Sequence, residues 1–205
     1  MRREVFEIVQ GMDLADIETQ LALQCAPLIA GLKMSNLLII EGDHLSEVRR
    51  ILQDTSISCF VLSKTEQRLM TLLYNEEKLE AYLSDKNVKV FLRECGYQEV
   101  SLSEILPAFQ LRYQKYASGK EEFPHEMGVL LGYPIEDVEG FINNEGENFL
   151  YTGYWKVYAN LSVKIQLFRK FETARETLIQ LVSSGVSITD IIKFYSNSEL
   201  KKAAV

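Results

Sequence analysis

The sequence has few of the residues that build metal centres and redox sites. It holds two histidines and three cysteines in 205 residues, and no two cysteines form a Cys-x-x-Cys pair. Zinc and iron–sulfur sites need thiolates or imidazoles at short spacing. The sequence therefore implies no metal and no cofactor. Cys25, Cys59 and Cys95 each lie among apolar neighbours and are expected to be buried, reduced thiols.

Other absences exclude further classes of protein. The sequence has no glycine-rich phosphate loop and no Gly-x-Ser-x-Gly nucleophile motif. No apolar run approaches the roughly 18 residues of a membrane span. Glu7, Asp13 and Asp16 interrupt the N-terminal stretch where a signal peptide would be apolar. We therefore expect a soluble, cytoplasmic protein that does not associate with membranes.

Charge of one sign is in excess. The chain has 29 Asp and Glu against 22 Lys and Arg, which gives a formal net charge of −7 at pH 7. Binding to nucleic acid needs a basic face. We therefore expect no nucleic-acid partner, which leaves a small molecule or a protein. The sequence does not indicate an oligomeric state.

Short apolar runs alternate with helical periods, which predicts a mixed α/β fold in a single domain over residues 1–205. Helices should flank a small mixed sheet of about four strands, at Leu37–Ile40, Ile57–Leu62, Arg68–Tyr74 and Tyr151–Tyr158. The first two strands enclose a helix over Leu45–Leu52, which is typical of a parallel pair. The short connection after the second strand predicts a hairpin with the third.

The C-terminal half is rich in helical periodicity. The chain predicts helices over Asp13–Leu32 and Glu76–Cys95, from Ser101 or Ser103 to Tyr116, over Leu161–Val182, and from Ser187 or Thr189 onward. The polar residues 117–122 are a candidate hinge, and the tail 196–205 is expected to fray.

Residues 123–142 concentrate two prolines, three glycines and one of the two histidines. The pattern predicts two short helices, Glu126–Leu131 and Ile135–Ile142, joined by a turn at Gly132. This layout is similar to a DNA-binding helix-turn-helix. The second helix carries three carboxylates and no Lys or Arg, however, so it would repel phosphates.

His125 and Glu126 are the candidate catalytic residues. The pair is similar to the start of a zinc-protease motif, but the motif needs a second histidine where this chain has Val129. Two interpretations remain open for His125. Its ring could bond a backbone group before a helix, or it could act as a general acid or base oriented by Glu126.

The stretch Asn143–Tyr158 contains the only tryptophan, among several tyrosines and amides. Such residues line pockets for planar ligands, although alternate residues of a strand could also simply pack a core. One short helix separates Phe123–Tyr133 from Asn148–Lys156, so we expect these two stretches to lie side by side. The candidate ligand-binding residues are Tyr133, Asn148, Tyr154, Trp155 and Lys156.

Four segments together resemble one family: Cys25–Lys33, Phe123–Pro134, Asp137–Ile142 and Gly153–Tyr158. The resemblance is to domain-of-unknown-function family 3793, found mainly in anaerobic Gram-positive bacteria, and it spans nearly the whole chain. The family has no established reaction, cofactor or partner, so the resemblance implies membership and no activity.

Two functions are compatible with these observations. The favoured one is a non-catalytic binding or regulatory module for a small ligand or a protein. The alternative is a small-molecule enzyme in which His125 is the acid or base and Lys156 or Tyr154 holds an anionic substrate. An enclosed pocket around His125 and Lys156 would favour the enzyme, and an exposed apolar patch would favour the binding module.

Overall fold

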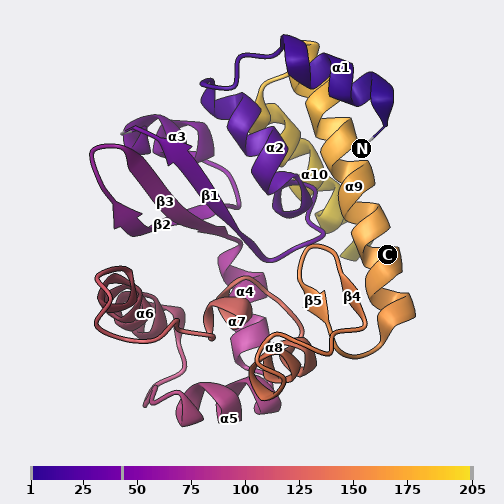
Figure 1. Ribbon diagram of the computed structural model, residues 1–205. Helices are drawn as coiled ribbons and strands as arrows, with labels where there is room; N and C mark the ends of the chain where they lie inside the picture. Colours follow the sequence, from indigo (N-terminus) through magenta and orange to yellow (C-terminus); the bar gives the residue numbers. More distant parts are fainter. Residues whose placement is uncertain (1, 43, 204–205) are drawn as a thin grey trace. The chain divides into compact units, whose positions relative to one another are not determined.

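The computed structural model describes residues 2–42 and 44–203, and it confirms a mixed helix-and-strand fold. Its elements, drawn in Figure 1, are α1 (Arg3–Gly11), α2 (Ile17–Ile29), β1 (Ser35–Glu41), α3 (Leu45–Leu52), β2 (Ser58–Lys64), β3 (Arg68–Tyr74), α4 (Glu76–Leu83), α5 (Lys86–Glu94), α6 (Leu102–Ala117), α7 (Met127–Leu130), α8 (Ile135–Asn143), β4 (Tyr151–Thr152), β5 (Lys156–Val157), α9 (Leu161–Ser183) and α10 (Ile188–Ala203). Within the described residues, no helix combines the length and the apolar sequence that a bilayer span requires.

The chain divides into two compact units. The first comprises the described residues of Met1–Asn75 and Lys170–Val205, and the second is Glu76–Arg169. Helix α9 contributes residues to both. A single domain and a hinge at 117–122 stay predictions. The tail 196–205 was predicted to fray. Its backbone is helical as far as Ala203, and residues 204 and 205 lie outside the described part.

The first unit contains a three-stranded sheet in the order β1-β3-β2. Strand β3 is antiparallel to both neighbours, so β1 and β2 run parallel to each other with β3 between them. The hairpin of β2 with β3 is confirmed. The predicted parallel direction is also correct, but β1 and β2 are not adjacent, because β3 turns back between them and pairs along both of its edges.

One face of this sheet forms the core of the first unit. Leu38, Ile40, Leu69 and Leu73 point to the same face and are buried against helices α2, α3 and α10. The amphipathic α3 supplies Val48 and two neighbours to this cluster. Burial of the apolar side chains of both layers is the main stabilising term for this unit.

The outer edge of β1 is covered by side chains of the chain itself. The amide of Gln24 in α2 donates to the carbonyl of Ile39 at 2.8 Å and accepts from its N–H at 3.0 Å. Asn36 donates to the backbone carbonyl of Gln24 at 2.8 Å. An exposed edge strand is a template for unwanted pairing, and these amides occupy part of that edge.

All three cysteines are free thiols. Cys25 is fully buried, as predicted, whereas Cys59 and Cys95 are only partly buried. Burial raises the pKa of Cys25 to about 12 and that of Cys95 to about 11, and it also raises the pKa of Cys59. Since the thiolate is the reactive form, a raised pKa lowers the reactivity of these cysteines near neutral pH.

Two predicted helices have different bounds. The first begins at Ile17 rather than Asp13, because the carboxylate of Asp16 accepts the backbone N–H of Thr19 at 2.7 Å and caps it. The predicted helix Glu76–Cys95 is two helices, α4 and α5. Asp85 interrupts it by accepting the N–H groups of Asn87 and Val88 as the cap of α5.

The predicted strand Tyr151–Tyr158 is wrong as a strand of the main sheet. The segment forms a separate hairpin of β4 and β5, each of two residues. The turn between them closes with Gly153 N–H donating to the carbonyl of Trp155 at 3.1 Å. The alternating aromatic pattern does not continue as a strand because Trp155 turns inward to a hydrogen-bond acceptor in α8.

Candidate functional site

Residues 126–143 form the predicted pair of short helices, α7 and α8. Gly132 adopts a left-handed φ of 68°, which ends α7 and lets Tyr133 donate its N–H back to the carbonyl of Gly128 at 2.9 Å. Gly128 lies so close to α8 that a Cβ there would be 2.9 Å from a methyl of Val138. The turn between α7 and α8 is therefore tightly packed.

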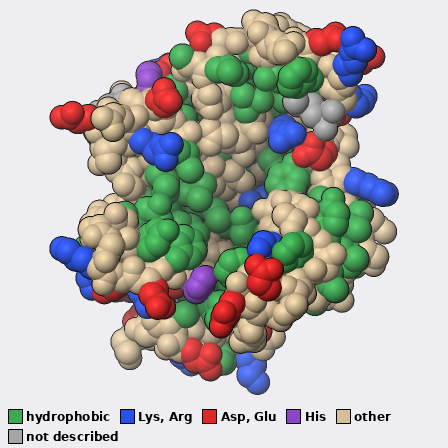
Figure 2. Space-filling view, in the orientation of Figure 1, with side chains coloured by type: hydrophobic (Ala, Val, Ile, Leu, Met, Phe, Trp, Pro, Cys, Tyr) green, Lys and Arg blue, Asp and Glu red, His purple; other side chains and the backbone are tan. Residues whose placement is uncertain are grey.

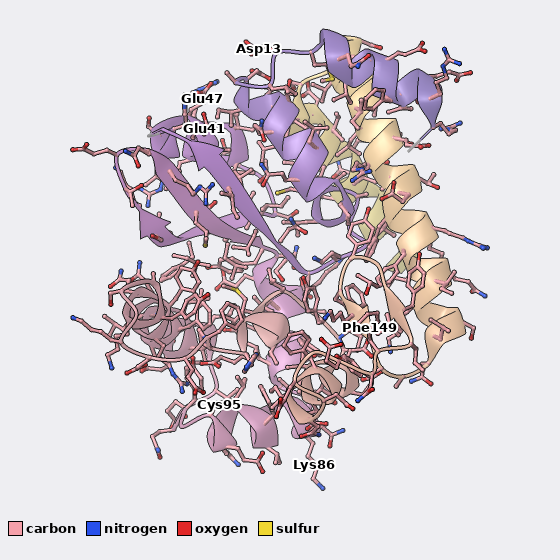
Figure 3. All side chains as sticks on the ribbon, viewed as in Figure 1. Asp13, Glu41, Glu47, Lys86, Cys95 and Phe149 are labelled. Atoms are coloured by element: carbon pink, nitrogen blue, oxygen red, sulfur yellow. The ribbon has the colours of Figure 1, made fainter. Side chains whose placement is uncertain are left out.

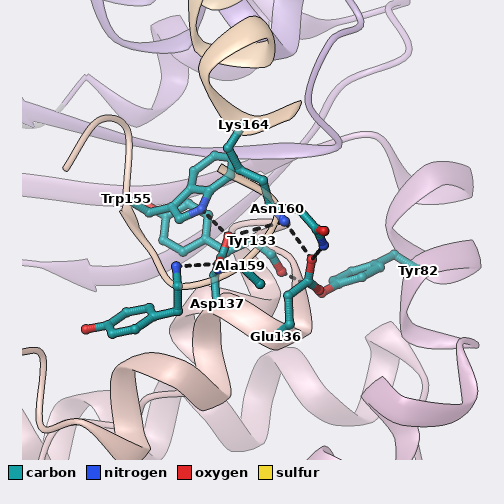
Figure 4. Close-up of polar contacts among 9 residues, drawn as sticks. Tyr82, Tyr133, Glu136, Asp137, Trp155, Ala159, Asn160 and Lys164 are labelled. Carbon is teal, nitrogen blue, oxygen red and sulfur yellow. Dashed lines mark hydrogen bonds and ion pairs between the residues drawn. The ribbon is translucent and has the colours of Figure 1, made fainter. Parts of the chain in front are cut away.

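Asp137 in α8 is the centre of a buried polar network (Figure 4). Its side chain is 2% exposed. One carboxylate oxygen accepts the indole N–H of Trp155 at 2.8 Å, and the other accepts the backbone N–H groups of Tyr158 at 2.8 Å and Ala159 at 3.1 Å. These three hydrogen bonds join α8 to the hairpin and to the segment directly after it, so Asp137 holds the two together.

Lys164 of α9 completes the network. Its ammonium lies 2.6 Å from Glu136 and 3.6 Å from Asp137, and its side chain is 6% exposed. Burial of Glu136 opposes its ionisation, but the hydrogen bond and charge of Lys164 hold the pKa of this carboxyl below its usual value. Asn160 lies 3.5 Å from the same carboxylate. These ion pairs join α9 to α8, and a buried cation needs such partners.

Tyr133 lies at the junction of the two stretches. Its ring stacks on Trp155 with centroids 4.9 Å apart, and its hydroxyl is 3.5 Å from the carbonyl of Tyr154. The carbonyl of Tyr133 accepts the hydroxyl of Tyr82 from α4 at 2.5 Å. Burial raises the pKa of both Tyr82 and Tyr133. The structure therefore brings Tyr133, Tyr154 and Trp155 together.

Glu126 is buried and bound to residues other than His125. It is 3% exposed, accepts the hydroxyl of Tyr97 at 2.9 Å and pairs with Arg112 at 2.8 Å. The guanidinium of Arg112 also lies over the ring of Tyr97 and donates to the carbonyl of Cys95 at 2.7 Å. These contacts tie α6 to the segment that begins α7.

His125 is exposed and lies in a row of aromatic rings. Its ring centroid is 5.6 Å from that of Phe123 on one side and 5.6 Å from that of Phe141 on the other. Phe123 in turn makes an edge contact with Tyr116 at 5.1 Å. Such separations are typical of favourable ring pairs. Tyr116 and Phe123 remain 38% and 37% exposed.

Lys156 extends this row. Its ammonium donates to the carbonyl of Gly146 at 2.6 Å and lies 5.8 Å from the ring of Phe141 and 4.7 Å from that of Phe149. Phe149, labelled in Figure 3 on the loop before β4, is 38% exposed. We name this surface, comprising Tyr116, Phe123, His125, Phe141, Lys156 and Phe149, the aromatic strip.

The comparison with protein families decides membership. Residues 21–192 match the family described as "Protein of unknown function (DUF3793)". The chain belongs to this family. The match includes the four segments whose resemblance was noted from the sequence. Comparisons with curated proteins and with solved structures gave no match.

In this DUF3793 chain the sequence-predicted residues occupy two neighbouring places. Tyr133, Tyr154 and Trp155 belong to the buried network, while His125 and Lys156 belong to the aromatic strip. Asn148 is exposed on the loop, in a left-handed conformation with φ of 54°. Among the described residues, no group of three or more His, Cys, Asp and Glu is placed to hold a metal ion.

Sequence reasoning missed Asp137 and Lys164, and it missed the outer rings of the strip. The sequence places Asp137 among three acids on a helix that would repel phosphate and at the start of a segment that resembles the family, but it does not mark Asp137 as a site residue. Its position at the third residue of α8 gave no sign of burial. The rings of the strip come from α6, α8 and two loops, so no local spacing could reveal them.

The first unit of the DUF3793 chain carries two open hollows of about 680 and 710 Å³ at the end of β1. Both are lined by Glu41, Gly42 and Arg68, and one is also lined by His44. Asp43, between these residues in sequence, lies outside the described residues. The polar turn after β1 has the composition of an ordinary strand end, so nothing in the sequence marks this region.

Proposed function

We propose that this protein is a cytoplasmic, non-catalytic binding module that holds a partner protein on the aromatic strip. The observation that carries the proposal is the unbroken row of rings from Tyr116 through Phe123 and His125 to Phe141. Lys156 continues the row to Phe149. No nucleic acid or membrane is part of the proposal.

Exposed aromatic rings favour recognition for a physical reason. A ring buries a large apolar area on binding and loses little rotamer entropy, so aromatic residues dominate the energetic centres of protein interfaces. What distinguishes the strip from other exposed apolar side chains is that its rings contact one another, and such a contiguous group is typical of a surface that meets a partner. Four members of the strip, Tyr116, Phe123, His125 and Phe149, are more than a third exposed.

The strip also rests on a rigid support. Phe141 belongs to α8, the helix that Asp137 fastens to Trp155 and Tyr158. Lys156 lies directly after Trp155 in the same hairpin. A surface that is already ordered before binding loses less entropy when a partner docks.

The enzyme alternative has less support. It requires Glu126 to orient His125, and the carboxylate of Glu126 is instead held by Arg112 and Tyr97. It also requires Lys156 or Tyr154 to hold an anion. The ammonium of Lys156 is engaged by the carbonyl of Gly146, and the ring of Tyr154 lies 5.5 Å from that of Phe168.

A thermal-shift screen with strip variants tests the proposal. Metabolites, cofactors and a peptide set are screened on the purified protein, because a ligand that binds only the native state raises its melting temperature. Hits are repeated on Phe123→Ala and Phe149→Ala. Val90→Ala and Leu111→Ala are the matched controls, since they remove exposed apolar side chains outside the strip.

We expect peptide hits that stabilise the wild type and both controls but neither strip variant. A hit that stabilises all variants equally would place binding elsewhere and contradict the proposal. A metabolite that the protein converts, with turnover lost in His125→Ala, would establish the enzyme alternative instead.

A further inference from the structure

We propose that the aromatic strip recognises a basic segment of its partner, an extended peptide in which Arg or Lys alternates with other residues. This inference rests on the proposed function and adds the chemistry of the partner. It is carried by a cation already seated on the strip, by the carboxylates beside it, and by the spacing of the rings.

The chain's own Lys156 shows how the strip receives a cation. Its ammonium lies 4.7 Å from the centre of the Phe149 ring and 5.8 Å from that of Phe141. A cation within about 6 Å of a ring centroid is attracted by the negative face of the ring. The rings of Phe123 and Tyr116 offer the same chemistry to a cation from another chain.

Exposed carboxylates lie next to members of the strip in sequence. Glu122 precedes Phe123, and Glu145 and Glu147 lie on either side of Gly146, whose carbonyl accepts from Lys156. Lys115, the basic residue beside Tyr116, is paired with Glu121 at 2.7 Å. Figure 2 shows exposed hydrophobic side chains with acidic and basic side chains between them on the face that it draws. Charge complementarity thus favours a basic segment and disfavours an acidic one.

The spacing of the rings suits an extended peptide. Successive centroids along Tyr116, Phe123, His125 and Phe141 are 5.1, 5.6 and 5.6 Å apart. In an extended strand, side chains on one face recur every second residue, roughly 6.6 Å apart. Alternate side chains of a bound peptide can therefore each meet a successive ring.

The test is a selection from a random peptide display library on the purified full chain, followed by anisotropy titrations of the enriched peptides. Each peptide is measured against wild type, Phe123→Ala, Phe149→Ala and the control Val90→Ala. One further variant, called the Gln variant, carries Gln at positions 122, 145 and 147 in place of Glu122, Glu145 and Glu147. It removes three negative charges and leaves the rings in place. Circular dichroism melting confirms that every variant is folded.

We expect enriched peptides with Arg or Lys at alternate positions. Their affinity should fall about tenfold or more in the strip variants and in the Gln variant, and remain unchanged in Val90→Ala. Neutral or acidic peptides that still depend on Phe123 and Phe149 would overturn the basic segment and leave the binding module standing. Binding that ignores the strip variants, or no enrichment at all, would overturn both proposals.

Discussion

The carboxylate of Asp137 accepts the indole N–H of Trp155 across 18 residues of sequence, at 2.8 Å and in a buried setting. The same carboxylate holds two backbone N–H groups just after the hairpin. One side chain therefore fixes the position of α8 relative to the only tryptophan. The surface that we propose for binding depends on this internal bond.

Asp137→Asn should destabilise the protein strongly. The N–H group of the new amide would face N–H donors whose hydrogen bonds the carboxylate accepts in the wild type. Lys164 would also lose its ion pair with Asp137. Removal of one partner from a buried charged network costs about 3 kcal/mol or more. Urea denaturation of Asp137→Asn beside Glu139→Gln, an exposed acid of the same helix, measures the loss. Equal midpoints for the two variants would show that Asp137 is not a structural anchor.

Gly140→Ala should also destabilise, although alanine favours helices. An added Cβ would lie 2.5 Å from the Cβ of Tyr158, and neither atom can move without a backbone shift. We expect a net loss of about 1–3 kcal/mol in the free energy of unfolding. Gly11→Ala in α1 is the matched control, because nothing lies within 4 Å of its Cβ. A gain in stability for both variants would refute the close contact.

The ion pair of Glu136 and Lys164 should contribute stability that depends on pH. Because the folded state holds the pKa of Glu136 below its usual value, the contribution is present above the unfolded pKa of about 4.3 and is lost as the pH falls through the folded pKa. Glu136 is 41% exposed, so the contribution at pH 7 is at most about 1 kcal/mol.

Denaturation of the wild type and Glu136→Gln between pH 3 and 7 checks this prediction. The two curves should differ near neutrality and converge at low pH. In a Lys164→Met background, the difference that Glu136→Gln makes should shrink, because the ion-pair partner is deleted while Asn160 remains. A gap between wild type and Glu136→Gln that widens on acidification would have the wrong sign.

His125→Ala and Lys156→Ala should differ in stability, although both lie on the strip. His125 is exposed, so its replacement should change the free energy of unfolding by no more than about 0.5 kcal/mol. Lys156→Ala removes the donor to the Gly146 carbonyl and should cost roughly 1 kcal/mol. Chemical denaturation of both variants measures this. A large loss in His125→Ala would make that residue architectural.

Much of the fold could be predicted from the sequence because it depends on local patterns. Arg68–Tyr74 is a strand with the predicted bounds, and α9 and α8 lie within a residue of their predicted ends. In these segments the apolar period and the residues at the ends agree with the final structure. Helix α1 was not predicted, although Val5, Ile8 and Val9 recur in it at helical spacing.

The predictions failed where a side chain far along the chain determines the local structure. Tyr151–Tyr158 has the composition of a strand, yet Asp137 draws Trp155 inward and the segment turns. His125 and Glu126 are adjacent in sequence, but one is exposed among rings and the other is buried against Arg112. Only tertiary contacts separate them, and no spacing within the sequence encodes those contacts.

The first unit is assembled from two pieces of chain, and this affects the order in which it can form. Ile188, Ile191 and Ile192 of α10 belong to the same core as Leu38 and Leu73 of the sheet. During synthesis these isoleucines follow the whole of Glu76–Arg169. At roughly 5–20 residues per second, the nascent sheet waits on the order of ten seconds for its last covering helix. In that interval α2 and α3 can already pack on the sheet, and we expect the part of the core that α10 completes to stay open until the second unit has been made.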